Sequence, residues 1–261
     1  MSPGKVRKQR LDQLLVEREL VATRSQAQAL LLAGAVRVGW GDAARRDRRA
    51  GEQVPVDIEI ELDGGPRYVS RGGEKLAGAL DAFGVDPAGR ICLDVGASTG
   101  GFTDCLLQRG ARRVYAVDVG RGQLAESLRQ DARVVSMERT HAARLDPGDA
   151  DPLVLPEPVS LAAADVSFIS LTRLLRGVAA QVEPGGDLLP LVKPQFELSR
   201  HDAPKGVVHD PRARARAVAR VRDHARELGL EVLAEAESAL VGPSGNHEYF
   251  LHLRVPERPG S

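Results

Sequence analysis

The sequence predicts an α/β protein in which a Rossmann-like domain with a parallel sheet follows a small α+β domain. Three observations predict this. From about residue 75 onward, short apolar runs alternate with helical patterns, which is typical of βαβ units. The first of these runs is followed by a glycine-rich turn, and several runs end in Asp or Lys. Residues 10–62 instead combine two short helical patterns with alternating strand patterns.

The small domain is expected at residues 10–63. Leucines and alanines at helical spacing predict two helices, with Thr23 as the N-cap of the second and Gly34 at its end. Alternating apolar residues predict a short strand at 36–38 and a longer one at 54–62. Residues 1–9 contain basic residues and no acidic residue, and we expect a mobile basic arm there.

Charge is unevenly distributed along the chain, although the formal net charge is zero. Residues 1–50 contain 11 Lys and Arg against 5 Asp and Glu, so the rest of the chain is acidic. A basic segment on an acidic body indicates a polyanion partner, although a solvated face is the usual role of surface Arg and Lys. The residues expected to contact such a partner are Lys5, Arg7, Lys8, Arg10, Arg24, Arg37 and Arg71.

Three stretches of the small domain carry a recognisable pattern: R-L-D-x-L-L at 10–15, T-R-S-x-A-x-x-L at 23–30 and A-G-A-V-R-V at 33–38. This part of the chain resembles the RNA-binding domain named after ribosomal protein four of the small subunit. The resemblance covers residues 10–62 and implies that the small domain binds RNA.

The large domain is expected at residues 75–261, after a linker at 64–74. A helix from Lys75 precedes the first buried strand at 91–95, and Gly110 ends the helix that follows the glycine turn. The second strand ends at Asp118. The remaining pattern predicts strands at 134–137, 159–165, 188–192, 230–240 and 248–255, helices at 123–128, 171–182 and 212–228, and a loop at 146–158.

The glycine turn predicts a ligand site. Glycines between a strand and a helix let the backbone approach a ligand, and Asp118 after the next strand can accept both hydroxyls of a ribose. The spacing differs from the dinucleotide pattern G-x-G-x-x-G. With Asp94 before the turn, it suits a nucleoside without phosphates, such as S-adenosylmethionine. A tight turn with a capping Asp is the alternative.

Residues 96–100 also satisfy G-x-S-x-G, the nucleophile elbow of α/β-hydrolases, and Asp165 and His247 follow in the order of that fold. No H-G-G-G-type oxyanion loop precedes the motif, and the hydrolase interpretation leaves Asp118 without a function. The nucleoside site is therefore favoured.

Charged residues at the strand ends predict a catalytic site, because Asp94, Asp118, Asp165 and Lys193 fall at one edge of such a sheet. Methyl transfer from a sulfonium mostly needs alignment of donor and acceptor, but a ribose hydroxyl must also lose its proton to a base. A lysine beside a carboxylate can be that base, which makes Asp165 and Lys193 informative together. The simpler interpretation of Asp165 is that it caps a turn, and that of Lys193 is that it is a solvated strand end.

Six motifs follow one another along most of the chain. They are S-R-G-G-E-K-L at 70–76, D-V-G-A-S-T-G-G-F-T at 94–103, D-V-S-F-I-S-L at 165–171, L-V-K-P-Q-F-E at 191–197, K-G-V-V at 205–208 and G-N-H-E-Y-F at 245–250. Together they resemble the TlyA family, whose members are described as hemolysin TlyA or as 2′-O-ribose methyltransferases of ribosomal RNA, with an FtsJ/RrmJ-like catalytic domain.

The resemblance implies a class I S-adenosylmethionine-dependent methyltransferase fold that methylates a cytidine in ribosomal RNA of one or both ribosomal subunits. By position, the catalytic tetrad of the family falls on Lys75, Asp165, Lys193 and Glu248, with Lys193 as the base. The cofactor, S-adenosyl-L-methionine, would be bound by Asp94, Gly96, Ser98, Thr99, Gly100, Gly101, Phe102, Asp118, Val119, Ser167 and Phe168.

Other features limit the alternatives. Cys92 and Cys105 match no metal-binding spacing, so we expect core thiols in a reducing cytosol and no metal. A signal peptide and an apolar run of membrane-spanning length are both absent from the sequence, which predicts a cytoplasmic protein with no membrane partner. A hemolysin or pore former, and an RNA-binding protein with a non-catalytic methyltransferase fold, stay open as alternatives. Arg212, Arg214, Arg216, Arg220, Arg222 and Arg226 are expected as a solvated helix face rather than a second RNA contact.

Overall fold

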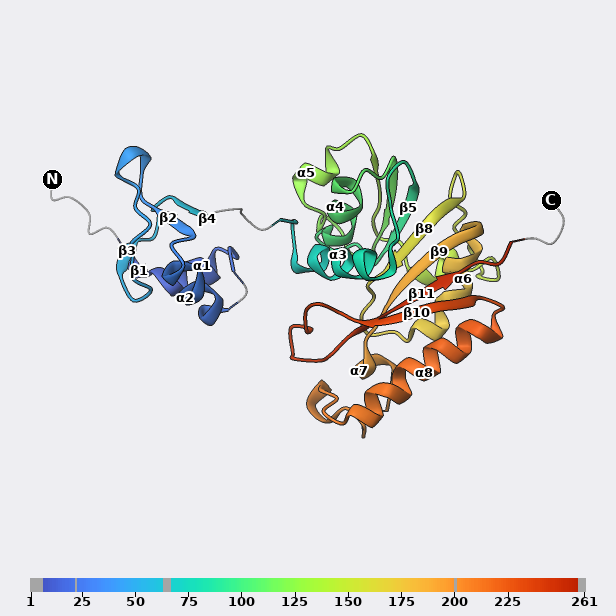
Figure 1. Cartoon of the computed structure of the whole chain (residues 1–261). Helices are drawn as coiled ribbons and strands as arrows, with labels where there is room; N and C mark the ends of the chain where they lie inside the picture. The colour runs from blue at the N-terminus through green and yellow to red at the C-terminus, as the bar shows by residue number, and fades with distance from the viewer. Residues whose placement is uncertain (1–6, 22, 63–66, 200, 258–261) are drawn as a thin grey trace. The chain divides into compact units, whose positions relative to one another are not determined.

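The computed structural model describes residues 7–21, 23–62, 67–199 and 201–257. The chain divides into two compact units, Met1–Arg67 and Tyr68–Ser261 (Figure 1). Lys5 and part of the predicted linker lie outside the described residues.

The first unit packs two helices against two small antiparallel sheets. β1 (Lys8–Arg10) pairs with β3 (Gln53–Pro55), and β2 (Val36–Val38) pairs with β4 (Ile60–Leu62). Between them lie α1 (Leu11–Glu17), α2 (Arg24–Leu32) and the 3-10 turn η1 (Gly41–Ala43). As predicted, the Thr23 side chain accepts from the Gln26 amide at the start of α2, and Gly34 follows the helix at φ +68°. The buried core is Leu11, Leu14, Leu15, Val21, Ala27, Leu31, Val36, Val38, Val54 and Ile58.

Two expectations for this unit are wrong. The predicted strand at 54–62 is two strands in different sheets, because the chain turns after Pro55, where the Ile58 amide donates to the Pro55 carbonyl. Ile58 is buried, so the alternation of apolar residues continued through the turn and concealed it. The expected mobile arm is also too long, since Lys8 and Gln9 belong to β1.

The second unit is built on one sheet of seven strands in the order β10-β11-β9-β8-β5-β6-β7. The pairings β5 with β6, β5 with β8, β6 with β7 and β8 with β9 are parallel, and β11 is antiparallel to both neighbours. The strands are β5 (Ile91–Val95), β6 (Arg113–Val117), β7 (Val134–Met137), β8 (Val159–Ala164), β9 (Val182–Val192), β10 (Glu231–Glu237) and β11 (Tyr249–Arg254).

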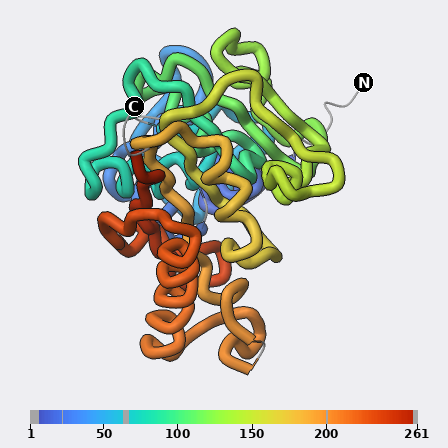
Figure 2. Tube along the Cα trace, turned by 90° about the vertical axis from the view of Figure 1, so that its right-hand side faces the viewer, coloured from blue at the N-terminus to red at the C-terminus, as the bar shows by residue number. Residues whose placement is uncertain are grey.

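Helices cover both faces of this sheet (Figures 1 and 2). Neighbouring residues of a strand point to opposite faces, so Cys92 packs with α3 and α4 on one side while Leu93 packs with α6 and α8 on the other. Both faces are therefore apolar, as expected of a parallel sheet. The helices and 3-10 turns are α3 (Arg71–Phe83), α4 (Gly101–Gln108), α5 (Glu126–Arg129), η2 (Ala142–Leu145), η3 (Leu171–Arg173), α6 (Leu175–Ala180), α7 (Pro194–Glu197), η4 (Pro204–Gly206) and α8 (Pro211–Glu227).

The predicted linker is partly structured. α3 begins at Arg71 rather than at Lys75, and Tyr68 before it is 2% exposed. A Cβ added to Gly73 would lie 2.2 Å from Cγ of Tyr68, so the tyrosine ring packs directly on the first turn of the helix. Glycines at 72 and 73 suggested a linker, but both belong to α3, and Gly73 makes room for the Tyr68 ring.

Other element boundaries also differ from the prediction. The helix expected at 123–128 is the shorter α5, and the helix expected at 171–182 is the turn η3 followed by α6. Residues 184–186, Pro-Gly-Gly, do not end a helix but lie inside β9, where the pairing with β8 shifts register between Val159 and Leu161. The pattern did not predict α7 or η4.

Candidate active site

The functional residues surround a cavity of about 540 Å³ at the carboxyl edge of the sheet. Its walls come from the turns after β5, β8 and β9, from the first turns of α3 and α4, and from the loop between β10 and β11. Open α/β sheets bind ligands at this edge. The lining residues are Ser70, Arg71, Gly72, Lys75, Gly96, Ala97, Ser98, Thr99, Gly101, Phe102, Asp165, Ser167, Phe168, Lys193, Gln195, Phe196, Pro243, Ser244 and Glu248.

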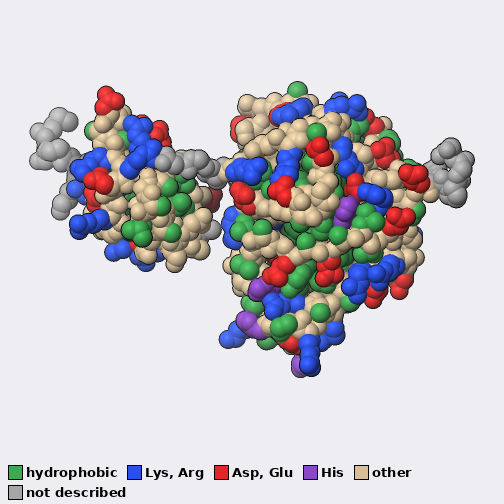
Figure 3. Space-filling view, in the orientation of Figure 1, with side chains coloured by type: hydrophobic (Ala, Val, Ile, Leu, Met, Phe, Trp, Pro, Cys, Tyr) green, Lys and Arg blue, Asp and Glu red, His purple; other side chains and the backbone are tan. Residues whose placement is uncertain are grey.

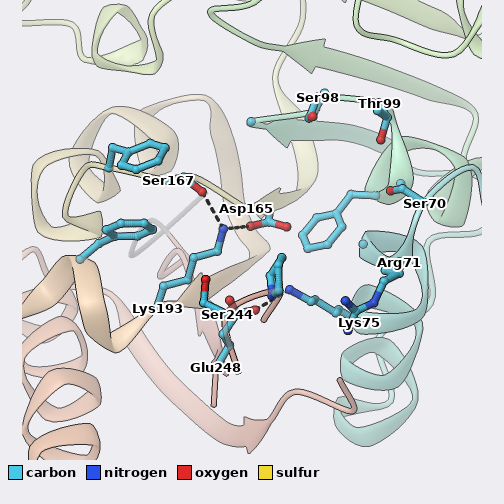
Figure 4. A pocket seen from close by; sticks show the side chains of 18 of the residues that line it. Ser70, Arg71, Lys75, Ser98, Thr99, Asp165, Ser167, Lys193, Ser244 and Glu248 are labelled. Carbon is cyan, nitrogen blue, oxygen red and sulfur yellow. Dashed lines mark hydrogen bonds and ion pairs between the residues drawn. The ribbon is translucent and has the colours of Figure 1, made fainter. Parts of the chain in front are cut away.

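Four charged side chains meet in this cavity as two ion pairs (Figure 4). Lys75 Nζ lies 2.5 Å from Glu248 Oε2, and Lys193 Nζ lies 2.5 Å from Asp165 Oδ1. Lys193 Nζ also donates to Ser167 Oγ at 3.0 Å. Since burying an unpaired charge is costly, each lysine is stabilised by its carboxylate partner. The four residues predicted to form the catalytic tetrad therefore lie at one cavity, although they are up to 173 positions apart in the sequence.

The fold holds each member of these pairs on a different element. Lys75 lies in the first half of α3, Asp165 and Lys193 follow β8 and β9, and Glu248 precedes β11. The loop that leads to Glu248 is tied to α3, because Arg71 donates to the Val241 carbonyl at 2.9 Å. A Cβ on Gly242 would lie 2.5 Å from Glu248 Oε1, so any other residue there would push that carboxylate out of its present position.

The glycine turn after β5 reaches the cavity with its backbone. Gly96 has φ +86°, and a Cβ there would lie 2.4 Å from the Asp165 carbonyl oxygen, so the turns after β5 and β8 are in close contact. Of the residues predicted to bind a cofactor, the structure brings seven to the cavity: Gly96, Ser98, Thr99, Gly101, Phe102, Ser167 and Phe168.

The other four predicted cofactor residues do not line this cavity. Gly100 faces the core, since a Cβ there would lie 2.3 Å from Leu128 Cδ1. Asp118 accepts from the Ser98 amide at 2.8 Å and from the Gly120 amide at 2.6 Å, so its carboxylate holds the two turns together. Val119 is 63% exposed next to it.

Asp94 is fully buried beneath the glycine turn. Its Oδ2 accepts from the Thr103 amide at 2.9 Å and from Thr103 Oγ1 at 2.7 Å, whereas Oδ1 has no hydrogen-bond partner among the described residues. Burial in a dry site raises the pKa of this carboxyl to about 7; the bonds from Thr103 lower it, and the negative charge of Asp165 adds to the increase. A cation near the turn would therefore be stabilised by ionised Asp94.

Aromatic side chains form one rim of the cavity. Phe168 is 92% exposed, and its ring centroid lies 5.2 Å from that of Phe196. Its φ of +65° is unusual for a bulky residue and turns the chain outward between Ser167 and Ile169. An exposed aromatic ring beside a polar cavity offers a surface on which a planar ring can stack.

The hydrolase interpretation is wrong. Asp165 is paired with Lys193, and His247 Nδ1 is paired with Glu237. Ser98 Oγ instead donates to Gln123 Oε1 at 3.3 Å. The three residues of the supposed triad are thus each engaged with a different partner, and the nucleophile–base–acid chain of a hydrolase is not formed.

The basic residues of the first unit differ in whether their side chains are already bound to a carboxylate of the same unit. Arg10 and Arg24 both bind the buried carboxylate of Asp12, and hydrogen bonds from Arg10 hold the pKa of Asp12 well below its usual range. Arg37 pairs with Glu61. Arg7 and Lys8 are exposed, and Figure 3 shows Lys and Arg side chains over the visible face of this unit.

The prediction missed several polar residues at or near the cavity, among them Gln195, Glu197 and Asn246. Glu197 is 2% exposed, and its Oε1 accepts from the Leu171 amide at 2.8 Å. Asn246 is equally buried, and its carboxamide bonds the Val208 amide and the Gly206 carbonyl. All three lie inside motifs quoted above, so those motifs could have indicated them as site residues. Their hydrogen-bond partners can be identified only from the fold.

Among the described residues, no group of three or more His, Cys, Asp or Glu is placed to hold a metal ion. Within the same residues, no helix combines the length and apolar character needed to cross a bilayer. Cys92 and Cys105 are both buried free thiols.

Comparisons with known proteins agree with this architecture. The FtsJ-like methyltransferase family model matches residues 68–255, and the S4 domain model matches residues 9–41. The chain is 47% identical over 250 residues to the Mycobacterium tuberculosis 16S/23S rRNA (cytidine-2'-O)-methyltransferase TlyA, covering 95% of this chain and 91% of the relative. It is 37% identical over 247 residues to Hemolysin A of Brachyspira hyodysenteriae, covering 94% of this chain and all of the relative.

A solved structure from Streptococcus thermophilus, described as a candidate hemolysin, superimposes with a TM-score of 0.72 at 39% identity. The superposition covers 98% of this chain and 92% of the other. The similarity to these relatives thus extends over both units and nearly the whole length of the chain. The chain therefore belongs to the TlyA family and combines an S4 domain with an FtsJ-like methyltransferase domain.

Proposed function

We propose that this protein methylates the 2′-hydroxyl of a ribose in ribosomal RNA, with S-adenosyl-L-methionine as the methyl donor and a cytidine as the target nucleoside. The observation that carries the proposal is the meeting of the Lys75–Glu248 and Lys193–Asp165 ion pairs at one cavity beside the glycine turn. The M. tuberculosis relative is named for the same reaction, which supports the choice of substrate.

The residues at the turn fit the donor. The cavity volume of about 540 Å³ is in the range of small-molecule sites. Gly96 and Gly101 leave no room for a Cβ, so the backbone itself forms the floor. The unpartnered Oδ1 of Asp94 supplies negative charge beneath it. When bound, the donor supplies a methyl group on a positively charged sulfur, and Ser98, Thr99, Phe102 and Phe168 would hold its nucleoside and amino acid parts.

The protein then has to align the acceptor and remove its proton. The neutral amine of Lys193, formed when the ammonium of its ion pair with Asp165 gives up a proton, would accept the proton of the ribose hydroxyl as that oxygen takes the methyl group from the donor sulfur. Asp165, at 2.5 Å, stabilises the ammonium that results. Lys75, held by Glu248, binds the ribose from the other side of the cavity. Charge balances, because the positive charge moves from sulfur to the lysine.

The first unit would bring the RNA to this site. Arg7 and Lys8 are exposed on its surface, and contacts of this kind with phosphates give affinity without reading sequence. We assign RNA binding to the domain at residues 10–63 together with the basic residues that precede it, and catalysis to the unit that begins at Tyr68. Because the substrate is part of the ribosome, we propose that the enzyme works in the cytoplasm.

The direct test is transfer of a labelled methyl group to isolated small and large ribosomal subunits that lack the modification. We expect label in the RNA of at least one subunit, on the 2′-oxygen of a single cytidine mapped by nuclease digestion and mass spectrometry. Label on a base nitrogen or carbon, or no transfer to either subunit, would overturn the proposal.

A further inference from the structure

A second cavity adjoins the catalytic one. It has a volume of about 580 Å³ and shares Phe168, Gln195 and Phe196 with the catalytic cavity, so these residues form a wall common to both. We refer to it as the side cavity. The other residues that line it are Ile169, Ser170, Thr172, Arg173 and Arg220. The lining thus includes two arginines and, among the described residues, no Asp or Glu.

Two polar groups of the side cavity lack protein partners. Gln195 Oε1 is buried without a hydrogen bond to any described residue, although a buried carbonyl oxygen is costly to leave unpaired. Arg173 is exposed, and its guanidinium makes no hydrogen bond or ion pair within the described part of the chain. One group requires a hydrogen-bond donor and the other an anion, and a nucleotide carries both.

The walls of the side cavity are held in place without a ligand. Glu197, buried in the turn after β9, binds the turn after β8 through two contacts: Oε2 accepts from Ser170 Oγ at 2.5 Å and Oε1 from the Leu171 amide at 2.8 Å. From α8, Arg220 Nη1 donates to the Glu197 carbonyl at 2.8 Å. A preformed site loses less free energy on binding than one that must be ordered first.

The position of the side cavity suggests its ligand. An RNA strand whose target ribose lies between Lys75 and Lys193 continues through a phosphodiester to a neighbouring nucleotide, and the shared wall puts the side cavity within reach of that neighbour. Resting on the function proposed above, we infer that the side cavity binds the nucleotide adjacent to the methylated one on the same RNA strand. Arg173 and Arg220 bind its phosphate, and Gln195 accepts a hydrogen bond from a base edge.

Arg173→Gln in the full-length protein tests this inference, with unmethylated ribosomal subunits as the RNA. We expect kcat/KM for the RNA to fall about tenfold while the dissociation constant of S-adenosylmethionine stays within twofold. The slope of log kcat/KM against log salt concentration should become shallower by about one, because one phosphate contact is lost. Arg112→Gln, at another exposed arginine of the same unit, is the matched control and should leave both quantities unchanged.

Gln195→Leu keeps the size of the side chain and removes its hydrogen-bonding groups. It should lower kcat/KM for the RNA without changing the salt slope, which separates the base contact from the phosphate contact.

The outcomes distinguish this inference from the proposed function. If the wild-type enzyme methylates RNA and Arg173→Gln retains its kcat/KM and its salt slope, the inference is wrong and the proposed function stands. A parallel loss of cofactor affinity in Arg173→Gln would also overturn the inference, because the effect would then be on the catalytic cavity. Absence of methyl transfer by the wild type would instead refute the proposed function.

Discussion

Lys193 and Lys75 are two buried cations at one cavity, and each is neutralised by its own carboxylate. They differ in what else they contact. Lys193 also donates to Ser167 in the turn that lines the cavity, whereas the ammonium of Lys75 bonds to Glu248 alone among the described residues. Because removing one partner of a buried pair leaves the other charge uncompensated, substitutions here affect local stability as well as chemistry. Each test must therefore measure binding of the methyl donor separately from the rate of methyl transfer.

Lys193→Ala is expected to lower the rate of methyl transfer by 10²-fold or more, on the order expected for loss of a general base, because no other amine takes its place beside Asp165. The dissociation constant of the donor should change by no more than a few-fold. Isothermal titration measures binding, and labelled-methyl transfer measures the rate. Lys205→Ala, at an exposed lysine outside the cavity, serves as the control and should keep full activity. Unchanged turnover in Lys193→Ala would remove Lys193 from the mechanism.

Donor binding is expected to depend on pH through Asp94. Burial raises the pKa of this carboxyl to about 7, so it is mostly protonated below pH 6 and mostly ionised above pH 8. A cationic donor favours the ionised form, so its affinity should increase as the pH rises from 6 to 8, and binding at pH 6 should release a proton.

Calorimetric titrations of the donor in buffers of different ionisation enthalpy measure the number of protons released on binding. Asp94→Asn, which cannot ionise, should bind the donor more weakly and without this pH dependence. A wild-type affinity that is constant across the range would contradict the role given to Asp94.

At the scale of elements, the start of α3 forms part of the wall of the catalytic cavity. Ser70, Arg71 and Gly72 line the cavity, and Tyr68 packs under the first turn of the helix that carries Lys75. Close contact between a ring and a glycine backbone leaves no space for a side chain, so this helix start is determined by packing rather than by an N-cap hydrogen bond.

Gly73→Ala is expected to destabilise the second unit by about 1–3 kcal/mol, because the new methyl group overlaps the Tyr68 ring. In Gly78→Ala, in the same helix, the new methyl group would lie 3.1 Å from Ala239 Cβ. The free energy of unfolding should therefore fall clearly less than in Gly73→Ala. Urea unfolding followed by far-UV circular dichroism measures the change. Trp40, the single tryptophan, lies in the first unit, and its fluorescence transition should be the same in all three proteins. Equal stability of both variants would show that the Tyr68 contact is not tight.

At the scale of the whole molecule, the chain separates a unit with an S4 domain from a unit with an FtsJ-like methyltransferase domain. The S4 match lies within Met1–Arg67, and the FtsJ-like match begins at residue 68, where the second unit begins. All residues that line the catalytic cavity belong to the second unit. Donor binding therefore needs only the second unit, whereas affinity for a large RNA draws on both.

Deletion of residues 1–67 is expected to weaken binding to ribosomal subunits at least tenfold and to leave donor affinity within threefold of the wild type. Filter binding at fixed salt measures the first quantity, and calorimetry measures the second. A truncated protein that binds subunits as tightly as the full chain would exclude the first unit from RNA recognition. Parallel loss of both affinities would show that the second unit depends on the first for its fold.

Sequence patterns predicted the strands of the large sheet well, because a strand buried on both faces must be a short apolar run, as residues 91–95 and 159–164 are. They failed where packing overrides local preference. Gly72 and Gly73 indicated a linker, but both lie in α3, where Gly73 accommodates Tyr68. Pro184-Gly185-Gly186 indicated a helix end but lies at a register shift in β9. In both places the deciding contact is with a residue that is not identifiable from the local sequence.

The sequence by itself determined the family, the two-part organisation and the identity of the charged residues at the strand ends, because these follow from local motifs and their order. Only the tertiary structure decided how those residues pair: Lys75 with Glu248, Lys193 with Asp165, and Glu197 with the turn after β8. Such pairing depends on which strands are neighbours in the sheet, and strand order is set by packing across the whole unit rather than by any single segment.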